Sequence, residues 1–233
     1  MRRLMAACMA AAAFASLGAA VQAQSNLVVV ELYTSQGCSS CPPADALLNE
    51  LAERDDVLPL ALHVDYWDYI GWKDQFANPK FTKRQKAYAH AAGEHMIYTP
   101  QIIVGGQEHL VGNKPMHLAK LIETHAAQPV AVHLSLRREG GGVVVSAPAV
   151  AGLGEMLVQL VRYIPEKTVD IGRGENAGRR ITYSNVVTDW QVLGSWDGSS
   201  ALRMRADAPG ADPVVIVVQK AGHKAILAAT RLR

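Results

Sequence analysis

Cysteine is scarce in this chain. Only three cysteines occur among its 233 residues, and the first, Cys8, falls in an apolar N-terminal run. Cys38 and Cys41 therefore have no further cysteine with which to pair. A second Cys-x-x-Cys pair and a His-x₃₋₅-His motif after a suitable spacer are also missing, which disfavours a four-ligand zinc site.

The chain has little excess of charge of either sign. It carries 23 Lys and Arg against 21 Asp and Glu, and residues 1–23 hold two of the arginines and no acid, so residues 24–233 have a formal net charge of zero. Nucleic-acid binders and proteins that bind anionic membranes need a basic excess, so both classes are disfavoured. Internal repeats, low-complexity tracts and long linkers are absent too, and 49% apolar residues are typical of a globular protein.

The N-terminal segment differs from the rest of the chain. Arg2 and Arg3 precede an Ala-rich apolar run over residues 4–20, and Val21-Gln22-Ala23 offers small residues at a cleavage site. This layout predicts a secretory signal peptide over residues 1–23. The run is short for a membrane-spanning helix, so we expect an exported, periplasmic or secreted protein without a stable membrane anchor. An oxidising compartment would allow Cys38 and Cys41 to form a disulfide.

Residues 24–128 alternate between strand and helix patterns. The continuous apolar runs at 27–34 and 57–64 predict buried strands, and apolar residues at helical spacing between them predict a helix over 42–54. Such a strand–helix–strand unit makes the two strands parallel. The pattern continues with a helix over 79–92, a hairpin of strands at 99–104 and 108–111, and a closing helix over 116–127.

The composition changes at Gln128-Pro129. Helical periodicity disappears after this point, and strand-like segments alternate with turns rich in Gly, Pro and Asp. About seven strands at such spacing predict an all-β, sandwich-like domain over residues 129–233. The expected strands lie at residues 131–137, 142–147, 155–164, 181–188, 201–207, 214–219 and 224–231.

The two remaining cysteines stand where a buried strand meets a helix. The spacing Cys38-Ser39-Ser40-Cys41 lets the two sulfurs meet with little backbone strain, and Pro42 and Pro43 are tolerated because they fall in the first helical turn. The free N–H groups of the helix N-terminus stabilise a thiolate and lower its pKa. We therefore expect Cys38 to be the attacking nucleophile and Cys41 the resolving thiol.

Two other interpretations of the cysteine pair stay open. An inert structural disulfide is one, although closing so short a loop restricts the unfolded chain little. Such a protein would act by interaction alone. The other is a soft-metal carrier in which Cys38 and Cys41 bind an ion such as Cu(I), together with His95 or Met96.

Residues 26–127 resemble the thioredoxin superfamily. The strand–Cys-x-x-Cys–helix junction carries this resemblance, together with Thr99-Pro100 at the start of a strand and Glu31 seven residues before Cys38. The resemblance implies that Pro100 is cis and faces the dithiol, with the neighbouring backbone binding substrate. It also implies that Glu31 is a buried carboxylate that exchanges protons with Cys41, although a solvent-facing strand carboxylate is an equal alternative.

More narrowly, the chain is similar to a family of exported bacterial proteins, with plant relatives, known only as a domain of unknown function. The matching stretches are YTSQGCSSCPPAD, HVDYWDYIGWKDQFA, YTPQIIVGG and RGENAGRR. Two positions depart from thioredoxins, which carry Trp before the first cysteine and Gly-Pro between the two. Gly37 and Ser39-Ser40 stand there instead. Because the intervening residues tune the redox potential, the direction of exchange stays open.

Two further segments are candidates for binding. Six aromatic residues lie within residues 66–81, next to the carboxyl end of the second strand, so Asp65, Trp67 and Asp68 could line a substrate groove beside the cysteines. Packing around a local helix is the alternative. The Arg- and Gly-rich segment 173–180 could bind a carboxylate or phosphate, or be a solvated loop between domains. His63, inside a strand, is more typical of a core histidine than of a ligand.

The sequence thus favours an exported thiol–disulfide oxidoreductase. We expect a thioredoxin-like α/β domain followed by the β domain. The catalytic residues would be Cys38, Cys41 and Glu31, and the substrate-binding residues Thr99, Pro100, Asp65 and Trp67. The substrate would be a protein or small-molecule thiol or disulfide, with an unassigned redox partner, no nucleic acid, no cofactor and no resident metal.

Overall fold

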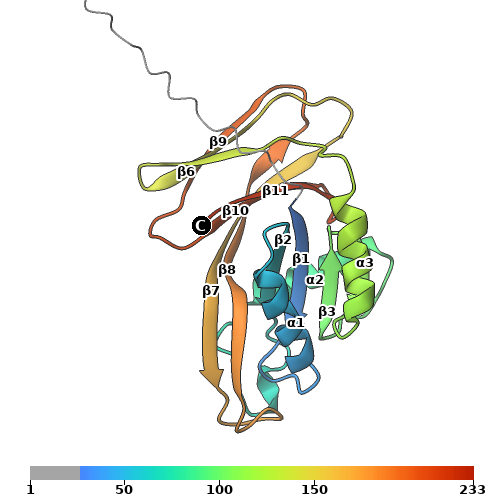
Figure 1. The fold of residues 1–233 in the computed structure, drawn as a ribbon, viewed down its shortest axis with the longest axis vertical. Coiled ribbons are helices and arrows are strands. Elements are labelled where there is room, and N and C mark those ends of the chain that lie inside the picture. Colours follow the sequence, from blue (N-terminus) through green and yellow to red (C-terminus); the bar gives the residue numbers. More distant parts are fainter. Residues whose placement is uncertain (1–26) are drawn as a thin grey trace, which may run out of the picture.

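The computed structural model describes residues 27–233, so the expected signal peptide lies outside the described residues. Strands and helices alternate in the first half of the chain, and strands alone follow (Figure 1). The first half contains β1 (Val28–Thr34), α1 (Pro42–Ala52), β2 (Val57–His63), the short 3₁₀ helix η1 (Asp68–Ile70), α2 (Pro79–Ala91), β3 (Gln101–Val104), β4 (Glu108–Val111) and α3 (Pro115–Ala126). The second half contains β5 (Ser135–Glu139), β6 (Gly142–Ala147), β7 (Met156–Asp170), β8 (Arg180–Trp196), β9 (Leu202–Asp207), β10 (Val214–Lys220) and β11 (Ile226–Leu232).

An eight-stranded sheet runs through both halves, with the strand order β11-β10-β7-β8-β2-β1-β3-β4. β1 pairs with β2 in parallel and with β3 in antiparallel orientation. Every residue of β1 and β2 is buried, which explains their continuous apolar runs, because both faces of these strands are covered. The predicted parallel strand–helix–strand unit is confirmed.

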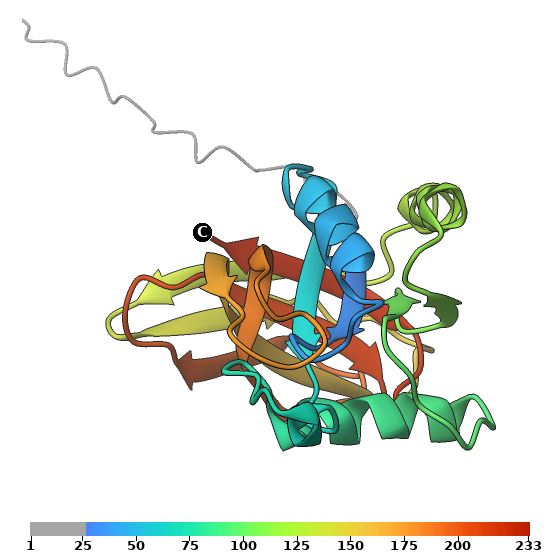
Figure 2. The ribbon, with the colours of Figure 1, turned by 90° about the horizontal axis from the view of Figure 1, so that it is seen from below.

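Helices cover both faces of the first half of this sheet. α1 and α3 lie on one face and α2 lies on the other, as Figure 2 shows. The side chains of β1 alternate between the faces: Val30 and Leu32 pack in a core with Leu48 of α1 and Leu118 of α3. Tyr33 packs with Phe81 and Tyr88 of α2 on the opposite face.

The strands after residue 128 extend the same sheet. β8 pairs with β2 at Ala61 and Val186, and β7, β10 and β11 follow in antiparallel order. Val161, Val187 and Val215 of these strands belong to the same core as Leu58 of β2. One sheet and one core therefore continue across residues 128 and 129. The division into two domains at this point stays a prediction.

The remaining strands, β5, β6 and β9, form a separate three-stranded sheet. It stacks on the far end of the large sheet across an apolar core that includes Val143, Val145 and Leu160 (top of Figure 1). The molecule is thus a mixed α/β protein with one large and one small sheet, and the sandwich-like packing is limited to this end.

Two strands are longer than the sequence predicts. β7 and β8 span 15 and 17 residues, whereas the apolar pattern indicates only 155–164 and 181–188. Residues 165–168 of β7 have the sequence Pro-Glu-Lys-Thr, and all four are exposed. Pairing with β8 therefore maintains this part of the strand without an apolar pattern. No helix among residues 27–233 is long and apolar enough to cross a membrane.

Candidate redox site

Cys38 and Cys41 form a disulfide at the end of β1. β1 ends at Thr34, a turn over residues 35–37 follows, and Cys41 is the N-cap of α1. The backbone N–H groups of Ala44 and Asp45 donate to the Cys41 carbonyl oxygen at 2.8 and 3.1 Å, which starts the helix directly beneath the disulfide. The N-terminal end of α1 therefore stabilises negative charge on either sulfur when the disulfide opens.

The disulfide is covered. Cys38 is 1% exposed and Cys41 is fully buried, although the two serines between them are exposed. The Ser40 hydroxyl lies 3.3 Å from Sγ of Cys38. A thiolate outside the protein has no open approach to either sulfur in this conformation.

The aromatic stretch after β2 packs against the turn that precedes Cys38. A Cβ atom placed on Gly37 would lie 3.2 Å from Cβ of Trp67 and from Cδ1 of Ile70. The indole N–H of Trp72 donates to the Gln36 side chain at 2.8 Å. Gly37 stands before Cys38 because the backbone packs closely against this stretch, which leaves no room for a tryptophan at that position.

The β7–β8 loop (residues 171–179) contacts the backbone at Cys38 and at the residues around it. The Asn176 amide nitrogen donates to the backbone carbonyl oxygens of Gln36 and Cys38, both at 2.9 Å. A carboxylate oxygen of Glu175 accepts from the Ser39 N–H at 3.3 Å. Figure 1 shows this loop beside the N-terminal end of α1, at the same end of the molecule. Residues about 140 positions apart in the sequence thus meet at the disulfide.

A cluster of buried polar side chains lies one helical turn below the disulfide. Asp45, four residues after Cys41, accepts a hydrogen bond from the Thr34 hydroxyl at 2.7 Å. Nδ1 of His63 lies 2.7 Å from a carboxylate oxygen of Asp74, and the His63 ring packs edge-on against Tyr183. Oδ2 of Asp45, Nε2 of His63 and the Tyr183 hydroxyl have no hydrogen-bond partner among residues 27–233.

The two carboxylates of this cluster have opposite pKa shifts. Burial raises the pKa of Asp45 to about 7, and the neighbouring His63 and Thr34 oppose this only in part. Burial also favours a raised pKa for Asp74, but the contact with His63 and the N–H groups of Gln36 and Phe76 outweigh it, so the pKa of Asp74 is lowered. Asp45 is therefore the carboxyl group near the disulfide that can gain or lose a proton near neutral pH.

Glu31 lies elsewhere. Its two oxygens accept from Nε and Nη2 of Arg84 at 2.8 Å each, and the Tyr88 and Tyr33 hydroxyls donate to it at 2.7 and 2.9 Å. Burial alone would raise the pKa of Glu31, but Arg84 and the two tyrosines reverse this and lower it. Glu31 faces α2, whereas Thr34, an odd number of residues further along β1, faces α1 and Asp45. The structure does not bring Glu31 together with Cys41.

The predicted substrate-binding residues divide into two groups. The Thr99–Pro100 peptide bond is cis. The indole N–H of Trp67 donates to the Thr99 hydroxyl at 2.7 Å, so the aromatic stretch and the segment before β3 are joined. Asp65 instead accepts a hydrogen bond from the Thr82 hydroxyl of α2 at 2.5 Å, so its carboxylate is directed towards α2.

Pro100 lies close to the first turn of α1. A Cβ atom on Gly112 would lie 2.8 Å from Cβ of Pro100 and 2.9 Å from Cβ of Ala44, so both residues contact the same glycine. Ala44 is three residues after Cys41. The cis proline therefore lies near the helical turn that begins at the disulfide. Trp67, Thr99 and Pro100 are thus grouped beside the cysteines, and Asp65 is not.

Sequence reasoning missed four residues of this site: Asp45, Asp74, Asn176 and Tyr183. Asp45 is the last residue of the YTSQGCSSCPPAD stretch, and its helical spacing from Cys41 could have revealed it. Asn176 lies within the RGENAGRR stretch, for which the arginines suggest anion binding. Its contact with Cys38 depends on the fold, and nothing in the local pattern signals it.

The described residues offer no cluster of side chains for a metal ion. Among residues 27–233 no three His, Cys, Asp or Glu side chains gather closely enough to hold a metal ion. Met96, a candidate ligand in the soft-metal hypothesis, is 79% exposed.

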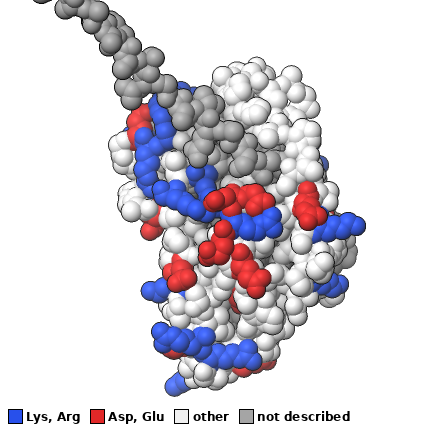
Figure 3. All heavy atoms as spheres, viewed as in Figure 1, with Lys and Arg blue, Asp and Glu red and all other residues white. Residues whose placement is uncertain are grey.

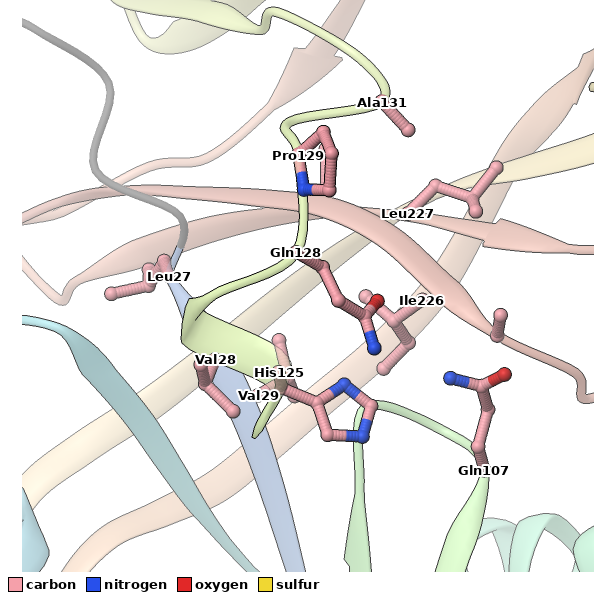
Figure 4. Close-up of a pocket in the computed structure, with 12 residues that line it drawn as sticks. Leu27, Val28, Val29, Gln107, His125, Gln128, Pro129, Ala131, Ile226 and Leu227 are labelled. Atoms are coloured by element: carbon pink, nitrogen blue, oxygen red, sulfur yellow. The ribbon is translucent and has the colours of Figure 1, made fainter. Parts of the chain in front are cut away.

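A small cavity lies away from the disulfide. Its volume is about 120 Å³. Figure 4 shows Val28 and Val29 of β1 on one side of it and Ile226 and Leu227 of β11 on another. It lies at the start of β1, whereas the disulfide follows the end of this strand, roughly 20 Å away. The cavity therefore belongs to the junction of the two halves and not to the site.

The charge on the visible face is mixed. Figure 3 shows both signs on this face: a row of Lys and Arg side chains at the upper left, with Asp and Glu side chains beside and below it. This distribution agrees with the balanced composition of the chain.

The fold and the site together define a class of mixed α/β protein with a covered Cys-x-x-Cys disulfide between a parallel strand and a helix. The chain belongs to the family described as "Protein of unknown function (DUF1223)", whose model matches residues 29–219.

Two solved structures are similar to it. The crystal structure of a protein from Agrobacterium tumefaciens is 33% identical, covers 90% of this chain and 96% of its own, and has a TM-score of 0.77. HBP35 of Porphyromonas gingivalis is 17% identical, covers 90% of this chain and 75% of its own, and has a TM-score of 0.61, a likeness of fold alone. A comparison with curated proteins finds no match.

Proposed function

We propose that this protein is an exported thiol–disulfide oxidoreductase with a thioredoxin-like first half. The observation that carries the proposal is the Cys38–Cys41 disulfide at the N-terminus of α1, directly after the buried strand β1. A helix N-terminus lowers the pKa of a thiol and so favours the reactive thiolate. A purely structural disulfide does not require this.

Several features of the first half support the thioredoxin-like assignment. α1 connects the parallel strands β1 and β2, and the β3–β4 hairpin pairs antiparallel to β1. Helices lie on both faces of these strands (Figure 2). The cis Thr99–Pro100 bond precedes β3 and lies near the first turn of α1. Export is proposed from the basic and apolar pattern of residues 1–23 alone.

The exchange reaction uses the two cysteines in order. In the reducing direction the Cys38 thiolate attacks a substrate disulfide, one sulfur of the substrate leaves as a thiolate, and a mixed disulfide forms. The Cys41 thiol then loses its proton and attacks Cys38, which releases the second substrate thiol and restores the Cys38–Cys41 bond. The substrate gains two electrons and two protons, and the protein dithiol is oxidised; the oxidising direction is the reverse.

Asp45 takes the role that the sequence suggested for Glu31. Cys41 needs a base as it attacks, and Asp45 is buried one helical turn away with a pKa of about 7 and an oxygen free of partners among the described residues. Glu31 is bound on both oxygens by Arg84 and faces α2. The proposal therefore keeps Cys38, Cys41, Thr99, Pro100 and Trp67 and replaces Glu31 by Asp45.

Reduction of insulin by dithiothreitol tests this function. We expect the protein to accelerate insulin precipitation, and Cys38→Ser to abolish the acceleration. Refolding of a reduced, disulfide-containing protein tests the opposite direction with the same variants. Absence of catalysis in both assays, by a protein whose disulfide is shown to open and close, would sink the proposal.

One observation favours an alternative. Cys38 is 1% exposed and Cys41 is fully buried, as expected for an inert disulfide in an interaction protein. Structural disulfides of exported proteins have reduction potentials below about −300 mV. Equilibration in glutathione and dithiothreitol buffers decides between the two: a potential in that range favours the inert disulfide, and a higher one favours the redox function.

A further inference from the structure

We infer that Asn176 is a positioning residue of the redox site, which holds Cys38 under the β7–β8 loop, so that a thiol reaches the disulfide only after this loop is displaced. The inference rests on the proposed function for its biological use. The contacts that carry it do not depend on that function.

The hydrogen bonds of Asn176 fix its orientation. Both acceptors, the carbonyl oxygens of Gln36 and Cys38, can only accept, so the amide nitrogen must face them. The amide oxygen has no partner among residues 27–233, and the side chain is held by these two donated bonds. Asn176 is 1% exposed, whereas Gly174, Ala177 and Gly178 around it are intermediate or exposed. A single buried side chain therefore connects an otherwise surface loop to the cysteine.

Contacts on either side extend this connection. A Cβ atom on Gly174 would lie 3.2 Å from Cβ of Trp72, so the loop backbone packs against the aromatic stretch. Glu175 accepts from the Ser39 N–H on the other side of Cys38. The loop is also closed at its base, where Ile171 exchanges backbone hydrogen bonds with Gly178 and Arg179 at 2.8 and 2.9 Å. It can thus separate from Cys38 as a unit.

Thiol–disulfide exchange requires access. An incoming thiolate must reach the sulfur of Cys38 from the side opposite Cys41, and the 1% exposure of Cys38 prevents this while the loop is in place. A substrate that binds next to Trp67 and Pro100 has binding energy available to displace the loop. A small thiol has none and reacts only in the fraction of molecules that are open. The loop thereby favours docked substrates over the free small thiols of the compartment.

The test follows the reduction of the disulfide by dithiothreitol, which needs no protein substrate. A dithiothreitol thiolate attacks Cys38, the Cys38–Cys41 bond breaks, and Cys41 leaves as a thiolate and takes up a proton. The second thiol of the reagent then attacks its own bound sulfur and releases Cys38. Dithiothreitol ends as a cyclic disulfide and the protein as a dithiol. Alkylation of quenched samples and mass spectrometry give the rate.

Three variants and the wild type are compared. Asn176→Ala removes the two bonds, and Asn176→Asp removes the donors but keeps the shape. Asn49→Ala is the matched control, since Asn49 also donates to a backbone carbonyl across the two halves, at Thr182 and 2.9 Å, but away from Cys38. Oxidised glutathione provides an open disulfide for reference.

We expect both Asn176 variants to be reduced at least about tenfold faster than the wild type, the factor that the loss of two ordinary hydrogen bonds produces. Asn49→Ala should stay within about twofold of the wild type. The inference is overturned if Asn49→Ala accelerates reduction as much as the Asn176 variants, or if neither Asn176 variant does. A wild-type rate equal to that of oxidised glutathione overturns it without any variant.

This result is separate from the proposed function. If the Asn176 variants are reduced faster but neither they nor the wild type catalyse insulin reduction or refolding, the oxidoreductase proposal fails and the positioning role stands. If catalysis is found and the Asn176 variants are reduced at the rate of the Asn49→Ala control, the oxidoreductase proposal stands and the positioning role fails.

Discussion

At the scale of single residues, two buried carboxylates near β1 differ in what surrounds them. Glu31 has a guanidinium and two phenols at hydrogen-bond distance, so it stays ionised. Asp45 has one hydroxyl at its side and is almost fully buried, so its charged form is disfavoured. The first carboxylate therefore stabilises the fold, and the second is available for proton transfer.

Asp45→Asn tests the proton-transfer role. Because only the carboxylate form of Asp45 accepts a proton from Cys41, the rate at which Cys41 resolves a mixed disulfide should rise with pH through about 7 in the wild type. In Asp45→Asn we expect the rise to disappear and the rate above pH 7 to fall at least about tenfold. A pH jump on protein carrying glutathione on Cys38 measures this rate.

Glu31→Gln is the control for that experiment. Removing one partner of a buried ion pair costs about 3–5 kcal/mol of the free energy of unfolding, which urea denaturation measures. The pH dependence of resolution should be unchanged if the variant remains folded. A shifted pH profile in Glu31→Gln, with a normal profile in Asp45→Asn, would restore the role that the sequence suggested for Glu31.

The raised pKa of Asp45 also predicts how stability depends on pH. The folded state keeps this proton up to about pH 7, whereas the unfolded chain loses it near 4. The stabilising contribution is therefore present below pH 4 and is lost as the pH rises through 7, by at most about 1.4 kcal/mol per pH unit. Asp45→Asn should gain free energy of unfolding relative to the wild type between pH 5 and 8. Parallel curves for the two proteins would show that Asp45 is ionised throughout.

At the scale of secondary-structure elements, the site depends on how closely three segments approach. Gly112 separates Pro100, before β3, from Ala44 in α1, with room for no side chain. Gly37 does the same between the cysteine turn and Trp67. Gly112 thus allows the cis proline to approach α1, and Gly37 allows the cysteine turn to approach Trp67.

Gly112→Ala should therefore push the Pro100 segment away from α1. A Cβ atom 2.8 and 2.9 Å from two neighbours forces one of them to move, and we expect a loss of about 1–3 kcal/mol in the free energy of unfolding. Insulin reduction should also slow at temperatures where the variant is folded. Gly141→Ala is the matched control, because nothing lies within 4 Å of a Cβ atom at that turn. Equal stability of the two variants would contradict the close approach.

Much of this level could be predicted from the sequence, because the signals are local. The apolar runs of β1 and β2, the prolines that open α1 and α2, and the glycines after β3 fix the elements almost to the residue. Helical spacing from Cys41 could also have indicated Asp45. The partnership of Glu31 with Arg84 and of Asn176 with Cys38 could not be foreseen, because each joins positions far apart in the chain through packing alone.

At the scale of the whole molecule, the two halves are joined through the sheet and through buried polar contacts. The Arg84 guanidinium lies 3.8 Å above the Trp190 ring and 3.3 Å from the Gln159 side chain. Gln219 of β10 donates to the Tyr88 hydroxyl at 2.8 Å. Single-sequence patterns show a change of composition at residue 129 but not this shared interior, so they predict two domains.

A fragment of residues 24–128 should consequently not fold stably. Removal of the second half exposes the edge of β2 that pairs with β8 and leaves the buried Glu31–Arg84 pair without its contacts with Trp190 and Gln219. We expect a poorly dispersed amide NMR spectrum and no cooperative thermal transition. A well-dispersed spectrum would show that the first half is an independent domain, as the sequence predicts.

The central claim is that Cys38 exchanges disulfides with a substrate and Cys41 completes the exchange. Trapping of a mixed disulfide tests it most directly. Cys41→Ser, with a free thiol at Cys38, is incubated with insulin, and adducts are separated under non-reducing conditions and identified by mass spectrometry. The account predicts a covalent adduct through Cys38 that dithiothreitol releases and that the wild type and Cys38→Ser do not accumulate. Absence of this adduct, even in Cys41→Ser combined with Asn176→Ala, would contradict the account.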